Sequence, residues 1–183
     1  KIQMEYNKYI CIAFHKRKVI RSMLDKYKCF KCIIKCYLKR QEYIHCEIVF
    51  PIEKKGNQQS LAYGVFQDTG VFEEYRTFTN PNYEYINLKV TSKEYDKILK
   101  FCQSQIGKEF DWFGAHISYF WAFRQKNKWW CGPFVVKALQ KIKLLKYYKP
   151  ETLSIDNIYY LCKEQGERNI INCHPNPYLN KFV

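Results

Sequence analysis

Short apolar runs separated by polar turns occupy much of the first half of the chain. Residues 9–14 (YICIAF), 44–50, 61–66, 71–78 and 85–90 are rich in β-branched and aromatic side chains, which is typical of strands. The sequence Gln67-Asp68-Thr69-Gly70 between two of these runs predicts the turn of a β-hairpin. The pattern therefore predicts five strands.

Elsewhere the apolar positions recur every three to four residues, which predicts helices over residues 19–38, 134–148 and 154–165. A further helix begins at a capping box formed by Thr91 and Glu94 and ends at Gly107, and Gly166 is expected to end the last helix. The order of strand, helix, several strands and then helices predicts an α+β fold, in which an antiparallel sheet packs against the helices. We expect one domain over residues 1–183, with a core at about 9–166 and an irregular tail at 167–183.

Composition narrows the class of protein. The chain has 183 residues, of which 47% are hydrophobic and 18% aromatic, and this excludes a disordered protein. Its nine cysteines are an odd number at spacings unlike those of a small secreted scaffold, which favours an intracellular, reducing, cytoplasmic location. The longest apolar runs fall well short of the roughly 20 residues that span a bilayer, so no transmembrane segment is expected.

The net charge of +14 points to an anionic partner, such as an anionic membrane, an acidic protein or a nucleic acid. The lysines are dispersed along the chain instead of forming one tract. A chain rich in Lys, Ile, Tyr and Asn together also fits compositional drift, so nucleic acid is the least favoured of these partners.

The sequence Trp130-Cys131-Gly132-Pro133 is the strongest candidate for chemistry. Proline is favoured in the first turn of a helix, so Pro133 predicts a helix that begins near Gly132. The unpaired amides and the dipole of that helix would stabilise a thiolate at Cys131, which is the form of cysteine that acts as a nucleophile. The alternative is a buried structural cysteine, which is the commonest state of a free cysteine.

A thiolate nucleophile needs a base, and four histidines are available: His15, His45, His116 and His174. His45 is favoured because alternation along residues 44–50 puts it on the same strand face as Glu47, whose carboxylate would favour the imidazolium. Two polar residues on one strand face also fit a solvent-exposed edge. His15 lies in a basic run, where a solvated role is expected.

Three motifs occur in a recognisable order. They are His45-Cys46-Glu47-Ile48-Val49-Phe50, then a Gly-x-x-Phe-Asp-x-x-Gly pattern from Gly107 to Gly114, then Trp130-Cys131-Gly132-Pro133-Phe134-Val135. Over residues 9–145 the chain resembles the permuted papain-like cysteine hydrolases, which are relatives of NlpC-type peptidases and include YiiX-like and poxvirus proteins and lecithin retinol acyltransferase. The histidine precedes the cysteine, as it does in the permuted order.

The resemblance implies a permuted papain-like fold in which Cys131 is the nucleophile and His45 is the base and later the acid. It leaves the third catalytic member open between Glu47 and the polar residues 57–60 (Asn57, Gln58, Gln59 and Ser60). Amides at the start of the Cys131 helix would form the oxyanion hole. Phe110 stands where relatives often have Tyr, so a hydroxyl role at that position is not expected.

Other groupings point to no cofactor and no metal. Cys29, Cys32 and Cys36 recur at helical spacing without an obvious fourth ligand, which favours a packing face over a metal site. The tryptophans Trp112, Trp121, Trp129 and Trp130 fit either a substrate groove or the core, and the core is expected for at least half of them.

The function expected from the sequence is hydrolysis of a peptide, isopeptide or amide through an acyl-cysteine intermediate. Two alternatives stay open. One is an acyltransferase or phospholipase that acts on lipid esters, and the other is a non-catalytic structural or virion-associated protein on the same fold.

Overall fold

The computed structural model describes residues 8–17, 41–52, 59–77, 81–117 and 124–170. The predicted helix over 19–38 lies outside these ranges, as do Cys29, Cys32, Cys36 and Trp121. So do Asn57, Gln58 and residues 171–183, which include His174.

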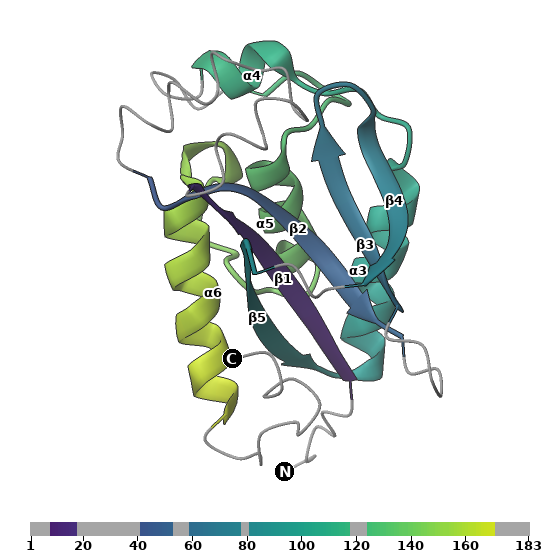
Figure 1. Cartoon of the computed structure of the whole chain (residues 1–183), viewed down its shortest axis with the longest axis vertical. Helices are drawn as coiled ribbons and strands as arrows, with labels where there is room; N and C mark the ends of the chain where they lie inside the picture. The colour runs from purple at the N-terminus through teal and green to yellow at the C-terminus, as the bar shows by residue number, and fades with distance from the viewer. Residues whose placement is uncertain (1–7, 18–40, 53–58, 78–80, 118–123, 171–183) are drawn as a thin grey trace.

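Five antiparallel strands form one sheet in the order β4-β3-β2-β1-β5 (Figure 1). The strands are β1 (Lys8–Lys16), β2 (Tyr43–Pro51), β3 (Gln59–Phe66), β4 (Gly70–Thr77) and β5 (Tyr83–Val90). The five predicted strands and the hairpin between β3 and β4 are therefore confirmed, with ends shifted by at most two residues.

Four α-helices lie within the described residues, namely α3 (Ser92–Gln105), α4 (Trp112–Ile117), α5 (Cys131–Gln140) and α6 (Ile155–Ile170). The capping box at the start of α3 is confirmed, because the Thr91 hydroxyl accepts from the Glu94 amide and the Glu94 carboxylate accepts from the Thr91 amide. The α+β class with an antiparallel sheet is confirmed as well.

The helix predicted over 134–148 extends too far at its C-terminal end. Helix α5 begins at Cys131, in agreement with the start near Gly132 that Pro133 predicts, but it ends at Gln140, because the backbone turns left-handed at Lys143 and Leu145, with φ of 66° and 52°. The Gln140 side-chain amide donates to the carbonyls of Leu145 and Tyr148 and so holds this turn. The turn buries Leu145, which is 7% exposed, and this burial stabilises the turn relative to a longer helix.

Gly166 does not end the last helix, since α6 continues to Ile170 and residues 167–170 of the expected irregular tail are helical. A Cβ at this glycine would lie 3.3 Å from the carbonyl oxygen of Asn87 and 3.4 Å from Ile86. The glycine therefore serves close packing of α6 on β5 and not termination of the helix.

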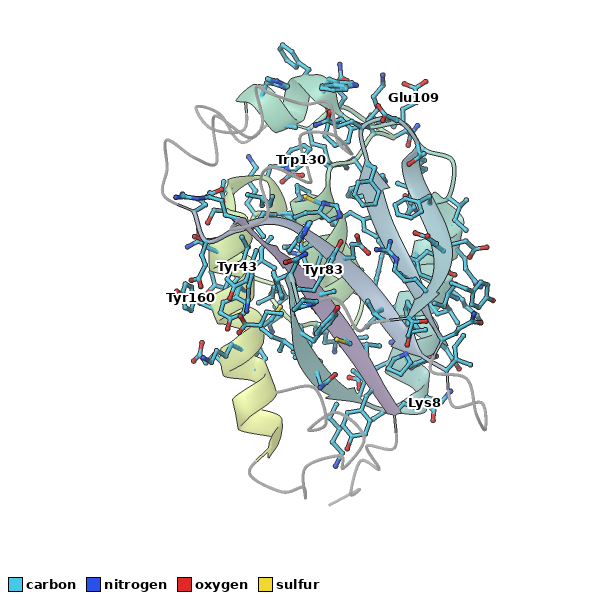
Figure 2. The ribbon with its side chains drawn as sticks, viewed as in Figure 1. Lys8, Tyr43, Tyr83, Glu109, Trp130 and Tyr160 are labelled. Carbon is cyan, nitrogen blue, oxygen red and sulfur yellow. The ribbon has the colours of Figure 1, made fainter. Side chains whose placement is uncertain are left out.

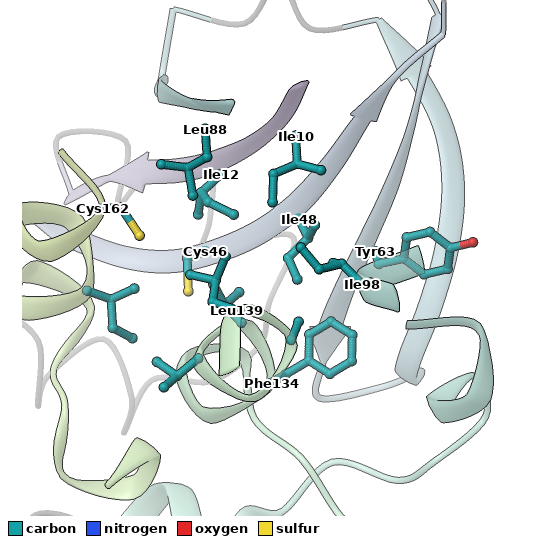
Figure 3. Close-up of a cluster of buried hydrophobic side chains, with 14 of the residues drawn as sticks. Ile10, Ile12, Cys46, Ile48, Tyr63, Leu88, Ile98, Phe134, Leu139 and Cys162 are labelled. Atoms are coloured by element: carbon teal, nitrogen blue, oxygen red, sulfur yellow. The ribbon is translucent and has the colours of Figure 1, made fainter. Parts of the chain in front are cut away.

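The main core lies between one face of the sheet and helices α3, α5 and α6, which cover that face (Figure 1). Figure 3 shows Cys46 and Ile48 projecting from β2 toward Phe134 and Leu139 of α5, and all four side chains are at most 1% exposed. Alternation puts His45, Glu47 and Val49 on the opposite face of β2. In the described part of the chain, no helix is long and apolar enough to cross a membrane.

Candidate active site

Cys131 is the first residue of α5. The preceding Trp130 is extended, with φ of −126° and ψ of 168°, and has no side-chain cap, so the first-turn amides of α5 have no side-chain oxygen to bind. Pro133 lies within that first turn, as predicted from its missing N–H. Cys131 is partly exposed, whereas the other described cysteines (Cys11, Cys46, Cys102 and Cys162) are buried. It is therefore the described thiol that a reagent or substrate reaches most readily.

The imidazole of His45 forms a side-chain hydrogen bond with Cys131, although 86 positions separate them in the chain. Helix α5 packs on β2, and this packing brings the two residues together. The His45 ring also stacks on Phe66 of β3, with centroids 4.5 Å apart and planes inclined by 23°. The ring is thus fixed on one side by an aromatic face and at one edge by the sulfur.

Glu47 is the third member of this group. Its Oε1 lies 3.1 Å from Nε2 of His45, and its side chain is 0% exposed. The alternative members Gln59 and Ser60 do not reach the site, because Ser60 pairs with Pro51 at the far end of β2. Six residues of strand separate Pro51 from His45, which is about 20 Å. Of the sequence candidates, the structure brings together Cys131, His45 and Glu47.

These contacts shift the acid–base balance of the pair. Burial acts to lower the pKa of His45, but the charge and hydrogen bond of Cys131 and then those of Glu47 outweigh it and raise the pKa to about 9. The pKa of Cys131 is held well below its usual range by a hydrogen bond from the Cys46 thiol, against desolvation, and by the charge and hydrogen bond of His45. The arrangement therefore favours a thiolate–imidazolium pair near neutral pH.

The sequence analysis missed Cys46 as a member of the site. Cys46 lies on the core face of β2 and is fully buried there. Its thiol and its backbone nevertheless both hydrogen-bond Cys131, because the start of α5 meets β2 at this point. A Cys directly after the histidine was the available signal, but strand alternation argued against a contact.

Arg76 of β4 was missed for a different reason. Its Nη2 lies 3.0 Å from Oε2 of Glu47, and its Nη1 lies 3.4 Å from Oε1. The residue lies 29 positions from Glu47 in the chain and one strand beyond the neighbour of β2, so no local spacing indicates it. A buried carboxylate at 0% exposure requires such a partner, and only the fold shows which cation supplies it.

His15 is a correction to the sequence interpretation. It was expected to be solvated, but it lies in β1 opposite His45, is 5% exposed and stacks on Tyr83 with ring centroids 4.4 Å apart. Its charge contributes to the lowered pKa of Glu47, after the larger effects of burial, which raises that pKa, and of His45 and Arg76, which lower it.

The Gly-x-x-Phe-Asp-x-x-Gly segment contacts and holds the residues that directly precede Cys131 in the chain. Asp111 is fully buried, and its carboxylate accepts the amides of Gly114 and Gln125, both at 2.6 Å. The Asp111 amide in turn donates to the carbonyl of Trp129, two residues before Cys131. A Cβ at Gly114 would lie 2.6 Å from the Trp130 ring, so the second glycine makes room for that side chain. Figure 2 shows Trp130 between α4 and the start of α5.

The tryptophans divide between core and surface. Trp129 is 5% exposed and belongs to the core, Trp130 is partly exposed, and Trp112 is 47% exposed. Near them an open pocket of about 260 Å³ is lined by the β3–β4 turn and by residues that include Phe110, Trp112 and Lys128.

Within the described ranges, no group of three or more His, Cys, Asp and Glu side chains is arranged to hold a metal ion. Comparison of the chain with models of protein families, with curated proteins and with solved structures finds no match. The chemistry of the site therefore has to be argued from its own geometry.

Proposed function

We propose that this chain is a cysteine hydrolase that cleaves an amide or ester through an acyl-cysteine intermediate, on a permuted papain-like fold. The observation that carries the proposal is the contiguous set Cys131, His45 and Glu47, in which a partly exposed thiolate faces an imidazolium held by a buried carboxylate. The antiparallel sheet, the helix that begins at the cysteine and the chain order of histidine before cysteine support the permuted fold.

In the first half-reaction the Cys131 sulfur attacks the carbonyl carbon of the substrate, and the oxygen of the tetrahedral intermediate carries the negative charge. Amides at the start of α5 are suited to stabilise that oxygen, because the first turn of a helix has unpaired N–H groups. When the bond to the leaving group breaks, its electron pair takes the proton of His45, which leaves a thioester on Cys131 and a neutral imidazole.

In the second half-reaction neutral His45 accepts a proton from water, and the oxygen of that water attacks the thioester carbon. Collapse of the second tetrahedral intermediate breaks the bond between carbon and sulfur. The products are the free acid and the starting thiolate–imidazolium pair. Glu47 holds the ring by its Nε2 in both steps, so the other ring nitrogen carries the transferred proton.

The test is to trap the acyl-enzyme with an activated ester such as p-nitrophenyl acetate. We expect the intact protein to gain one acetyl group, mapped to Cys131, at pH 7. Cys131→Ala should abolish the adduct, and His45→Ala should slow its formation by about 10²- to 10⁴-fold, the range of a lost general base. Cys102→Ala, which removes a fully buried thiol under α3, is the matched control and should acylate normally. Absence of both an adduct and Cys131-dependent release of p-nitrophenol, or an adduct on another cysteine, contradicts the proposal.

One observation favours the lipid-ester alternative. Trp112 and Phe113 of α4 are 47% and 53% exposed, and α4 is tied to the segment that leads to Cys131. Exposed aromatic side chains on a chain with a net charge of +14 fit an anionic lipid interface. Release of fatty acid from anionic phospholipid vesicles, compared with cleavage of peptides, separates the two substrate classes. Loss of vesicle activity alone in Trp112→Ser/Phe113→Ser would assign the lipid class.

A further inference from the structure

The carboxylate of Glu47 is an expensive group to bury. At 0% exposure it cannot be hydrated, and desolvation acts to raise its pKa toward the neutral acid. The lowered pKa that results shows that its partners outweigh burial. Glu47 therefore depends on cations close to it to stay ionised.

His45 cannot be that cation throughout the reaction. On the proposed function, which this inference rests on, His45 gives its proton to the leaving group and is neutral while the thioester stands. The charge of Arg76 does not change, because guanidinium keeps its proton at any relevant pH. Among the described residues, His45 and Arg76 form the hydrogen bonds and ion pairs that are seen with Glu47, and of these two Arg76 is the permanent cation.

The position of Arg76 suits it to neutralise the Glu47 carboxylate. Both of its terminal nitrogens contact the carboxylate of Glu47, because Nη1 donates a hydrogen bond to Oε1 at 3.4 Å and Nη2 forms an ion pair with Oε2 at 3.0 Å. Tyr83 of β5 hydrogen-bonds the same guanidinium, and Glu74 of β4 lies 3.1 Å from Nη2. Side chains from both edge strands, Arg76 of β4 and Tyr83 of β5, therefore interact beside Glu47 of β2.

Gly64 makes room for the Glu47 side chain on this face of the sheet. It lies on β3 beside Glu47, and a Cβ there would be 3.2 Å from Cγ of Glu47 and 3.0 Å from the Phe72 ring. A side chain at this position would press on both groups and would displace the carboxylate that Arg76 contacts.

We propose that Arg76 is a positioning residue, which keeps Glu47 ionised and its oxygen aimed at Nε2 of His45 while the proton on His45 comes and goes. Arg76 acts through Glu47 and not on the substrate. Without it, the buried site holds Glu47, His45 and Cys131 with one negative charge too many. The site is then expected to take up a proton, and the thiolate–imidazolium pair is lost at neutral pH.

The titratable and charged groups that act on this site come from β1, β2, β4 and β5 and from α5. They are His45 and Cys46 of β2, His15 of β1, Glu74 and Arg76 of β4, Tyr83 and Tyr85 of β5, and Cys131 of α5. The experiment must therefore separate the effect of Arg76 through Glu47 from its direct field at Cys131. A double-mutant cycle does this.

The measurement is the pH dependence of alkylation of Cys131 by iodoacetamide, followed by peptide mass spectrometry from pH 4 to pH 10. We expect Arg76→Gln to move the acidic limb to higher pH and to slow alkylation at pH 6 about tenfold. Arg76→Lys keeps the charge and should restore most of the rate. Glu74→Gln removes only the exposed partner of the same guanidinium and should leave the profile unchanged.

In the Glu47→Gln background, Arg76→Gln should have little further effect, because no buried carboxylate remains to be neutralised. An equal shift with and without Glu47 would mean that Arg76 acts directly on Cys131, and it would overturn the proposal. An unchanged limb in Arg76→Gln would also overturn it. Should Arg76→Gln fail to fold, as judged by circular dichroism, the neutral variant Arg76→Met in both backgrounds gives the same comparison, and no shift in either background would overturn the proposal.

Alkylation needs no substrate and no turnover. A protein that forms no acyl-enzyme but shows the Arg76 dependence would lose the proposed function and keep this inference. An active hydrolase whose alkylation profile does not depend on Arg76 would keep the proposed function and lose this inference.

Discussion

At the scale of single residues, Cys131 is set apart from the other described cysteines by its surroundings and not by its type. Burial raises the pKa of Cys11 to about 12 and that of Cys162 to about 12, whereas the pKa of Cys131 is lowered. The difference lies in donors and charge, because Cys131 accepts a hydrogen bond from Cys46 and faces an imidazolium. A reactive thiol among inert ones is thus a property of position.

The first prediction at this scale concerns Cys46. Its thiol is the largest of the influences that lower the pKa of Cys131, so Cys46→Ala should raise that pKa and slow alkylation of Cys131 at pH 6 several-fold. At pH 10, where the thiolate forms in either protein, the two rates should converge. The rate of iodoacetamide incorporation at the two pH values gives the result.

Cys102→Ala is the matched control for Cys46→Ala. This variant removes a thiol of the same size that is also 0% exposed. Cys102 lies in α3, away from the site, and burial is the largest influence on its pKa, which it raises. It should cost a similar packing energy and leave the alkylation profile as it was. Equal effects of the two variants would show that packing, not the hydrogen bond, explains the change.

At the scale of elements, the segment before α5 determines where Cys131 stands. Residues 109–111 pair with Trp129 through two backbone hydrogen bonds, and buried Asp111 ties this pair to the start of α4. The motif recognised in the sequence from Gly107 to Gly114 thus holds the backbone that leads to Cys131.

Gly114→Ala tests whether the segment from Gly107 to Gly114 positions Cys131. The added Cβ would lie 2.4 Å from the Asp111 carboxylate and 2.6 Å from the Trp130 ring, so one of them must move. We expect a loss of stability of about 1–3 kcal/mol, as for other overpacked sites, together with slower alkylation of Cys131. Thermal unfolding and iodoacetamide incorporation measure the two effects.

Gly166→Ala serves as the control for Gly114→Ala. Its Cβ meets the Asn87 carbonyl at 3.3 Å, far along the chain from the site, so it should lower stability slightly and leave the reactivity of Cys131 unchanged. If Gly114→Ala lowers stability without changing alkylation, Asp111 and Trp130 support the fold alone.

The elements also show what the sequence could and could not predict. Strands and the capped α3 follow from local alternation and a Thr–Glu pair, and these were predicted correctly. The length of α5 was overestimated because a turn with two left-handed residues keeps the apolar spacing that a helix would have. Gly166 was taken for a stop because the close approach of α6 to β5 cannot be known before the fold is.

The candidate site divides in the same way. His45 and Glu47 are two apart on one strand, so their neighbourhood was predictable, and Pro133 placed Cys131 at a helix start. Arg76 and Tyr83 enter only through the strand order β4-β3-β2-β1-β5, which no local pattern in the chain specifies. From the sequence, only the order of the motifs along the chain indicated that His45 and Cys131 belong to one site.

At the scale of the whole molecule, the charge of +14 does not arise from the site. The contacts of Glu47 with Arg76 and of Cys131 with His45 pair the charges there, so the site itself is close to neutral. The excess of cations lies on lysines dispersed along the chain. Such a distribution acts as a long-range field that concentrates anions near the protein surface and is screened by salt.

This field yields the last prediction, which compares anionic iodoacetate with neutral iodoacetamide at Cys131. Relative to the same two reagents on free glutathione, iodoacetate should be favoured at low ionic strength, and the preference should fall as the Debye length shrinks from about 30 Å at 0.01 M to about 8 Å at 0.15 M. The imidazolium of His45 lies against the sulfur, so its attraction should persist at the higher salt concentration. A preference that does not change with salt would assign the effect to His45 alone, and the net charge would then have no part in bringing acidic substrates to the site.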